Sequence, residues 1–105
     1  MNPNYPYPKS ENEFFSRQYS VDQLVKNYTF QQLMFFYYYG MNTLNVLNHI
    51  IDKNLFDEVG ELSHDVENDR THFVLRTAII RNAMQKMDNC QIYNHSNFIC
   101  VHHLN

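Results

Sequence analysis

Residues 29–52 read TFQQLMFFYYYGMNTLNVLNHIID and carry the strongest helical pattern in the chain. Apolar residues recur there at steps of three or four, namely Phe30, Leu33, Met34, Tyr37, Met41, Leu44, Leu47 and Ile51. This spacing places them on one face of a helix. Thr29 and Gln32 have the spacing of a capping box, in which two residues at a helix start satisfy each other's backbone donors. The pattern predicts one long helix over residues 30–52.

Gly40 lies in the middle of this predicted helix. A glycine inside a helix costs about 1 kcal/mol relative to alanine. Either the helix breaks into two at this residue, or a neighbouring backbone approaches it closely. We expect the helix to continue through Gly40.

Five consecutive aromatic residues precede this glycine. They are Phe35, Phe36, Tyr37, Tyr38 and Tyr39. Five residues in a row cover every direction around a helix, which is more than one buried stripe requires. Aromatic side chains are enriched at the anchors of protein interfaces. The run therefore predicts a surface that binds a partner chain, and burial of the same residues in the core is the alternative.

Three further helices are expected, over residues 21–27, 55–66 and 71–88. Ser20 and Gln23 repeat the capping-box spacing before the first of them. Helical spacing supports the other two through Leu55, Phe56, Val59, Leu62 and Val66, and through Phe73, Val74, Thr77, Ile80, Met84 and Met87. The sequence predicts a mainly α fold, a small domain of about four helices.

Charges are segregated along the last two predicted helices. Six acidic residues lie between positions 57 and 69, and Arg70, Arg76, Arg81 and Lys86 follow them. Four spread charges make only a weak basic stripe at physiological salt. We expect these basic residues to pair with the acidic segment across a helix hairpin.

The N-terminal residues have a different composition. Three prolines alternate with tyrosines within residues 2–9, which excludes a helix and favours an extended chain. We expect residues 1–19 to form a disordered or extended tail and residues 20–105 to form a single helical domain. A short docking peptide anchored by Tyr5 and Tyr7 is the alternative.

The composition limits the classes of protein. The chain has 105 residues, 44% of them hydrophobic and 18% charged, which is typical of one folded domain. A net charge of −3 argues against nucleic acid as the main partner. The N-terminus lacks the pattern of a signal peptide, and the apolar window 33–51 contains Asn42, Asn45, Asn48 and His49, which are costly in a membrane. We expect an intracellular protein without a membrane span.

Cysteine and histidine gather at the C-terminal end. Residues 90–103 are rich in β-formers and turn residues, so we expect a β-hairpin or an extended arm. A hairpin turning at His95 would set Cys90 opposite Cys100, with His102 on the same face. The candidate zinc ligands are therefore Cys90, His95, Cys100 and His102, with His49, His64 or His72 able to complete the set. A disulfide, or two buried cysteines beside a solvated tail, remain alternatives.

Signatures of catalysis are weak. Two glycines in the chain leave no phosphate-binding loop. The C-terminal segment also offers no Gly-rich turn, and no capped helix that begins at a cysteine, to activate a thiol. The sequence predicts a non-enzymatic structural or assembly adaptor that acts through other protein chains, with a homo-oligomer among the expected states. A zinc-stabilised binding module built on Cys90, Cys100 and nearby histidines is the alternative function.

Two segments carry a resemblance to a known family. They are VDQLVKNYTFQQLMFFYYYGMNTLNVLNHIID at residues 21–52 and NDRTHFVLRTAIIRNAMQKM at residues 68–87. In these segments, and in its size and single domain, the chain resembles the small, twelve-kilodalton nucleocapsid-associated proteins of baculoviruses. The resemblance implies a location in the host nucleus and the virion, contacts with nucleocapsid proteins and support of nuclear actin assembly. It assigns no functional residue.

Overall fold

A computed structural model describes residues 3–55 and 66–94. Within these ranges the chain is mainly helical, which confirms the predicted class, and no strand is present. The helices are α1 (Glu11–Phe15), α2 (Val21–Asn27), α3 (Phe30–Asp52) and α5 (Val66–Asn94).

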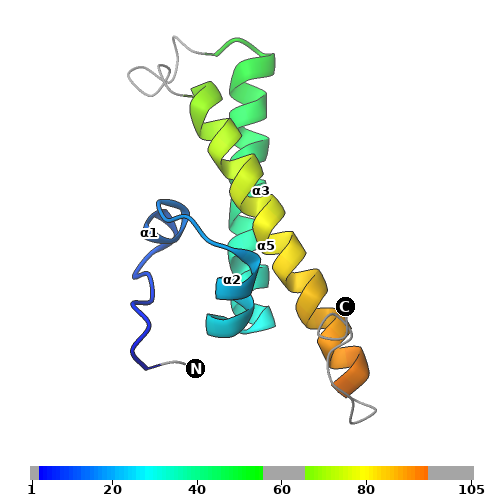
Figure 1. The fold of residues 1–105 in the computed structure, drawn as a ribbon. Coiled ribbons are helices and arrows are strands. Elements are labelled where there is room, and N and C mark those ends of the chain that lie inside the picture. Colours follow the sequence, from blue (N-terminus) through cyan, green and yellow to red (C-terminus); the bar gives the residue numbers. More distant parts are fainter. Residues whose placement is uncertain (1–2, 56–65, 95–105) are drawn as a thin grey trace.

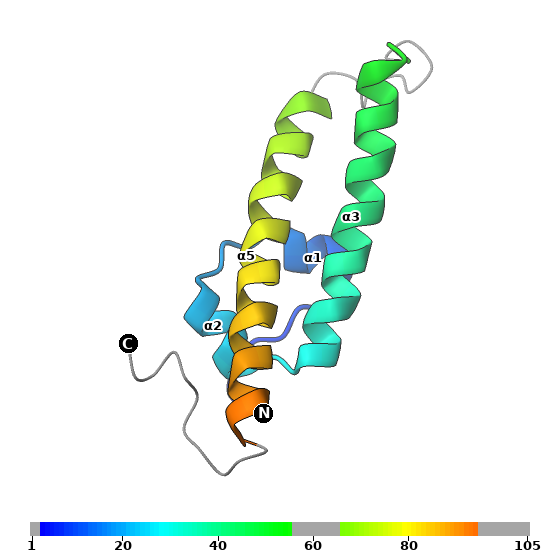
Figure 2. The ribbon, with the colours of Figure 1, turned by 90° about the vertical axis from the view of Figure 1, so that its right-hand side faces the viewer.

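The two long helices form the frame of the molecule. They pack against each other along most of the length of α3 and run in opposite directions (Figure 1). The short helices α1 and α2 lie together on one side of this pair, and α2 packs on α5. Figure 2, which looks at the side that lies to the right in Figure 1, shows α3 and α5 in front of α1 and α2. The described helices therefore cover the long pair on one side.

The helix starts predicted from capping boxes are confirmed. Ser20 Oγ accepts from the Gln23 amide at 3.1 Å, and Gln23 Oε1 accepts from the Ser20 amide at 2.9 Å. Thr29 and Gln32 make the same reciprocal pair at 3.1 and 2.9 Å. Because each box satisfies backbone donors that a helix start leaves free, α2 and α3 begin where the sequence predicts. Both helices also end at the predicted residues.

The helix α3 continues through Gly40, as expected. A Cβ atom placed on Gly40 would overlap the Thr77 methyl carbon Cγ2 and would lie 3.0 Å from Phe15 Cζ. The close neighbours are thus side chains of α5 and α1 rather than a backbone. Gly40 marks the point where three helices meet.

The helix α5 is longer than the predicted helix over 71–88. It begins at Val66 and ends at Asn94. The first strand of the predicted hairpin is therefore wrong, because residues 90–94 are helical. No proline or glycine interrupts the sequence of α5, and extending an existing helix costs far less than starting one. The rest of the hairpin, at 95–105, lies outside the described residues, as does most of the predicted helix 55–66.

The predicted N-terminal tail is wrong for part of its length. Residues 11–15 form α1, and its N-cap Ser10 accepts from the Glu13 amide at 3.1 Å. Phe14 and Phe15 in this helix are buried, at 0% and 7% exposure. A helix of five residues is too short to show a periodic pattern, and burial of its two phenylalanines stabilises it instead.

The core is aromatic and is centred on Phe14. The Phe14 ring stacks on Phe36 at a centroid distance of 3.9 Å and on Tyr19 at 4.6 Å. Phe15 and Tyr28 approach it edge to face at 5.2 and 5.7 Å. The other fully or almost fully buried members of this cluster are Leu24, Leu33, Ile80 and Ala83. The N-terminal segment is thus part of the core that α2, α3 and α5 share.

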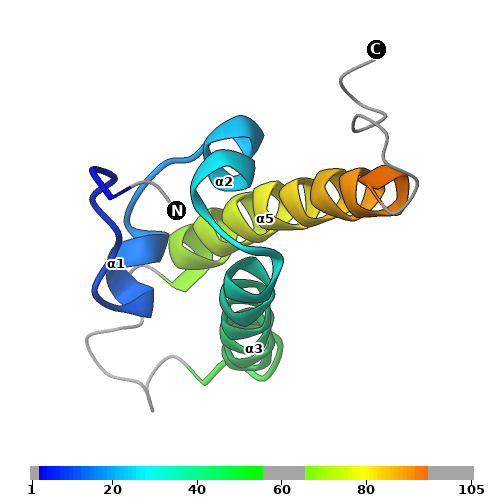
Figure 3. The same ribbon diagram turned by 90° about the horizontal axis from the view of Figure 1, so that it is seen from below.

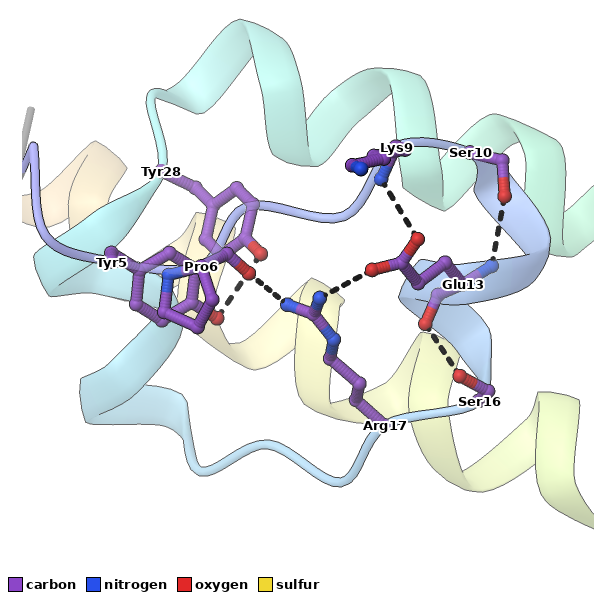
Figure 4. A network of polar contacts seen from close by, with 8 residues as sticks. All are labelled: Tyr5, Pro6, Lys9, Ser10, Glu13, Ser16, Arg17 and Tyr28. Carbon is purple, nitrogen blue, oxygen red and sulfur yellow. Dashed lines mark hydrogen bonds and ion pairs between the residues drawn. The ribbon is translucent and has the colours of Figure 1, made fainter.

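Polar contacts hold the N-terminal segment on this core. Arg17 donates to the Pro6 carbonyl and, at 2.6 Å, to Glu13 (Figure 4). Glu13 also accepts from the Lys9 amide at 3.2 Å. The hydrogen bond from Lys9, followed by the contacts with Arg17, lowers the pKa of Glu13. Tyr28 Oη donates to Tyr5 Oη at 3.2 Å, so the extended residues are tied to α2 as well.

Alkaline pH is expected to unfold the chain. Burial raises the pKa of both Tyr19 and Tyr28, and the hydrogen bond between Tyr28 and Tyr5 adds to the shift of Tyr28. The fold therefore favours the neutral phenols. This stabilisation is complete below the ordinary tyrosine pKa, about 10, and is lost as the pH rises further. We expect helical circular dichroism to fall together with a rise in tyrosinate absorbance.

The variant Tyr28→Phe removes one of these ionisations and should move the alkaline transition to higher pH. Tyr38→Phe is the matched control, because the Tyr38 side chain is exposed and its replacement should leave the transition in place. Complete ionisation of every tyrosine with unchanged helical signal would contradict the expectation.

Candidate protein-interaction surface

The structure divides the five aromatic residues predicted to bind a partner. Phe36 stacks on Phe14 in the core. Tyr39 lies 5.7 Å from the Phe15 ring, and its hydroxyl donates to Asn12 Oδ1 at 3.3 Å. Phe36 and Tyr39 thus hold α1 on α3. For these two residues, packing inside the protein was the alternative to partner binding.

The other three aromatic residues contribute to the surface. Tyr38 and Phe35 are 59% and 55% exposed, and Tyr37 is half-buried. Phe35 lines a hollow of about 370 Å³ together with the N-terminal residues Tyr7 and Pro8. Tyr37 and Tyr38 lie beside one another with their ring centroids 6.0 Å apart. The run therefore reaches two separate parts of the surface.

Two hollows lie between α3 and α5 and share two residues. One has a volume of about 230 Å³ and the other about 260 Å³, and Tyr37 and Arg81 line both. We call the joined hollows the interhelix groove. Its lining residues are Phe30, Tyr37, Met41 and Leu44 on α3, and Val74, Thr77, Ala78, Arg81, Met84, Gln85 and Asp88 on α5.

The interhelix groove belongs to the long helices alone. Its lining includes no residue of α1 or α2. In Figure 3, which looks along α3, α2 lies against α5 on the side away from α3. Val74 in the lining is 49% exposed, and the exposed Tyr38 follows Tyr37 on α3. The described part of the chain thus leaves an apolar face uncovered along its two longest helices.

Three of the four lysine and arginine residues of α5 have partners other than those predicted. Arg76 Nε donates to the Phe15 carbonyl at 2.7 Å, and Lys86 pairs with Asp22 of α2 at 2.6 Å. Arg70 donates to Asn48 Oδ1 at 3.4 Å. The acidic residues between positions 57 and 65 lie outside the described ranges. Within those ranges, no ion pair joins a basic residue to Glu67 or Asp69, which lie in the first turn of α5. In the described residues, then, α5 is tied to α1, α2 and α3 by other contacts.

Arg81 and Asp88 are the charged residues in the lining of the interhelix groove. Arg81 lies where the two hollows meet, and Asp88 lines only the smaller one. Both side chains are exposed, and among the described residues neither makes an ion pair or a hydrogen bond. A groove with apolar walls therefore carries one cation and one anion.

The predicted zinc ligands lie largely outside the described residues. Cys90 belongs to α5, whereas His95, Cys100 and His102 fall in the range 95–105. Within residues 3–55 and 66–94, no three histidine, cysteine, aspartate or glutamate residues cluster closely enough to hold a metal ion. The zinc site stays a prediction.

The α5 half of the interhelix groove was not predicted. A sequence signal for it exists, since Val74, Ala78, Arg81, Gln85 and Asp88 alternate at steps of four and three residues. This stripe lies beside the core stripe of the same helix. Its polar residues interrupt the apolar spacing, so apolar periodicity alone does not predict it.

Comparisons with known proteins found no match. No family model matches the chain, and neither a curated protein nor a solved structure matches it. None of the described helices combines the length and the apolar character that crossing a membrane requires.

Proposed function

We propose that the protein is a non-enzymatic interaction module, an adaptor that docks another protein chain in the interhelix groove. The observation that carries the proposal is the apolar groove between the two longest helices. Neither short helix contributes to its lining, and Val74 in the lining is exposed. The exposed Tyr38 ring lies 6.0 Å from the ring of Tyr37, which lines the groove. This is the predicted adaptor role with a more specific surface than the aromatic run alone.

The physical basis is the burial of exposed apolar surface. Transfer of apolar surface out of water contributes roughly 25 cal/mol per Å². Contiguous exposed apolar patches are typical of interaction sites, and aromatic side chains supply much of the binding energy at interfaces. A groove between two helices accepts the apolar face of a third helix, with contacts at every third or fourth residue. We therefore propose a helical segment as the docked element.

The resemblance to baculovirus nucleocapsid-associated proteins is compatible with this function. It adds nucleocapsid proteins to the partners that we propose, and the host nucleus and the virion to the proposed locations. It assigns no residue to the contact, so the proposed surface depends on the groove alone.

Site-specific cross-linking tests this function. A photoreactive phenylalanine analogue in place of Tyr38 keeps an aromatic side chain at an exposed position beside the groove. In cells that make the full chain, we expect it to cross-link to protein at least several times more than the same analogue in place of Lys26. Lys26 is exposed on α2, away from the groove, and is the matched control.

A second substitution links the cross-link to the groove. Val74→Glu should remove most of the excess cross-linking at position 38, because a charge in an apolar interface costs several kcal/mol. Val74 is half exposed, so the fold should tolerate this change, and helical circular dichroism checks that it does. Equal cross-linking at positions 38 and 26 would overturn the proposed function.

A further inference from the structure

The geometry points to a second copy of this chain as the occupant of the interhelix groove, with the two α5 helices packed antiparallel about a two-fold axis. The inference rests on the proposed function, since it names the partner of the same groove. The charges that line the groove carry it.

Three polar residues of α5 line the smaller hollow of the groove at helical spacing. Arg81, Gln85 and Asp88 are four and three residues apart, so they lie along one stripe of the helix. The cation is at one end of this stripe and the anion at the other. In the described part of the chain, neither Arg81 nor Asp88 has an ion-pair or hydrogen-bond partner.

A two-fold axis converts this stripe into a self-complementary surface. Two α5 helices that cross antiparallel between Met84 and Gln85 bring Arg81 of each copy opposite Asp88 of the other. In such an interface every contact occurs twice, because the same patch serves both copies. One charge pattern on one helix therefore supplies two intermolecular ion pairs.

The apolar lining suits the same arrangement. Met84 lies at the centre of the proposed crossing, where a flexible side chain adapts to its symmetry mate. Phe30 and Tyr37 line the groove from α3 and would cover the flank of the second α5. Burial of these side chains provides the affinity, and the two ion pairs fix the antiparallel orientation.

A second copy already has the residues that match the lining of the groove, whereas an unrelated chain would need to supply them. A different helix would need an acidic residue opposite Arg81, a basic residue opposite Asp88, and apolar residues between them. This chain already presents all three features on one face of α5.

Charge reversal tests the inference through sedimentation equilibrium of the full-length chain. We expect the native chain to form a dimer whose dissociation constant rises at high salt. Arg81→Glu places two carboxylates opposite one another at both ends of the crossing, and Asp88→Arg places two cations there. Each substitution should raise the dissociation constant at least about tenfold, which corresponds to about 1.4 kcal/mol or more.

Mixing the two variants gives the decisive result. In a mixed dimer the charges at both ends are again opposite, so an equimolar mixture of Arg81→Glu and Asp88→Arg should form a one-to-one dimer with restored affinity. The double variant should dimerise alone for the same reason. Lys26→Glu, a matched reversal of an exposed charge on α2, should leave the dimer unchanged.

Two outcomes would overturn the inference. The first is a native chain that remains monomeric at every concentration, and the second is a mixture that associates no better than its components. In either case, cross-linking of position 38 to a different protein would still support the proposed function. Cross-links between two copies through position 38, with a mass twice that of the chain, would support both.

Discussion

Replacing Phe14 with alanine should cost about 3–5 kcal/mol of folding free energy, the largest effect that we expect from a single substitution. Phe14 is completely buried and contacts aromatic rings from three parts of the chain, among them Phe36 of α3 at 3.9 Å and Tyr19 at 4.6 Å. Removal of the ring leaves a cavity at the centre of the core. Because domains of this size are stabilised by only about 5–15 kcal/mol, the loss is a large fraction of the total.

Urea unfolding followed by circular dichroism measures this loss. Phe35→Ala is the matched control, since it removes the same ring from a position that is 55% exposed. We expect the control to cost about 1 kcal/mol or less, because little apolar surface is uncovered. If both variants had equal stability, the N-terminal segment would not form part of the core.

Gly40→Ala should be the second most disruptive change, although alanine is the better helix former. The new Cβ would overlap Thr77 Cγ2 and crowd the Phe15 ring. The Thr77 hydroxyl donates to the carbonyls of Phe73 and Val74 at 2.6 and 3.1 Å, which holds the methyl group toward Gly40. Overpacking of this kind costs about 1–3 kcal/mol, against a gain of about 1 kcal/mol in helix propensity.

A double-mutant cycle isolates the cause of this loss. Thr77→Ser keeps the hydroxyl and removes only Cγ2, so Gly40→Ala should be less costly in that background by about 1–2 kcal/mol. Asn42→Ala, at an exposed position of the same helix, is the control and should leave stability nearly unchanged. Equal costs of Gly40→Ala in the two backgrounds would show that Thr77 does not limit the space at this crossing.

The parts of the fold that the sequence predicted depend on local interactions. The capping boxes at Ser20 and Thr29 and the apolar spacing of residues 30–52 lie within single helices, so their bounds could be read directly. The N-terminal helix α1 depends instead on Phe14 meeting Phe36, a contact between residues far apart in sequence. No local pattern reports such a contact. The local pattern does not predict the end of α5, because the residues after Cys90 are β-formers and only the helix that precedes them favours their helical conformation.

The candidate site was predicted in part for a related reason. The aromatic surplus of residues 35–39 was visible, but its division between core and surface depends on where α1 packs. Phe36 and Tyr39 face that helix, whereas Tyr37 faces α5. The sequence places Arg81 in a basic stripe, and only the fold shows that Arg81 and Asp88 line the same groove.

The most direct test of the interhelix groove as a protein-binding surface is the cross-linking yield at position 38 relative to position 26 in the full-length chain. We expect position 38 to give at least several times more cross-linked protein, and Val74→Glu to remove most of that excess. Equal yields at the two positions, with or without Val74→Glu, would contradict a binding role for the groove.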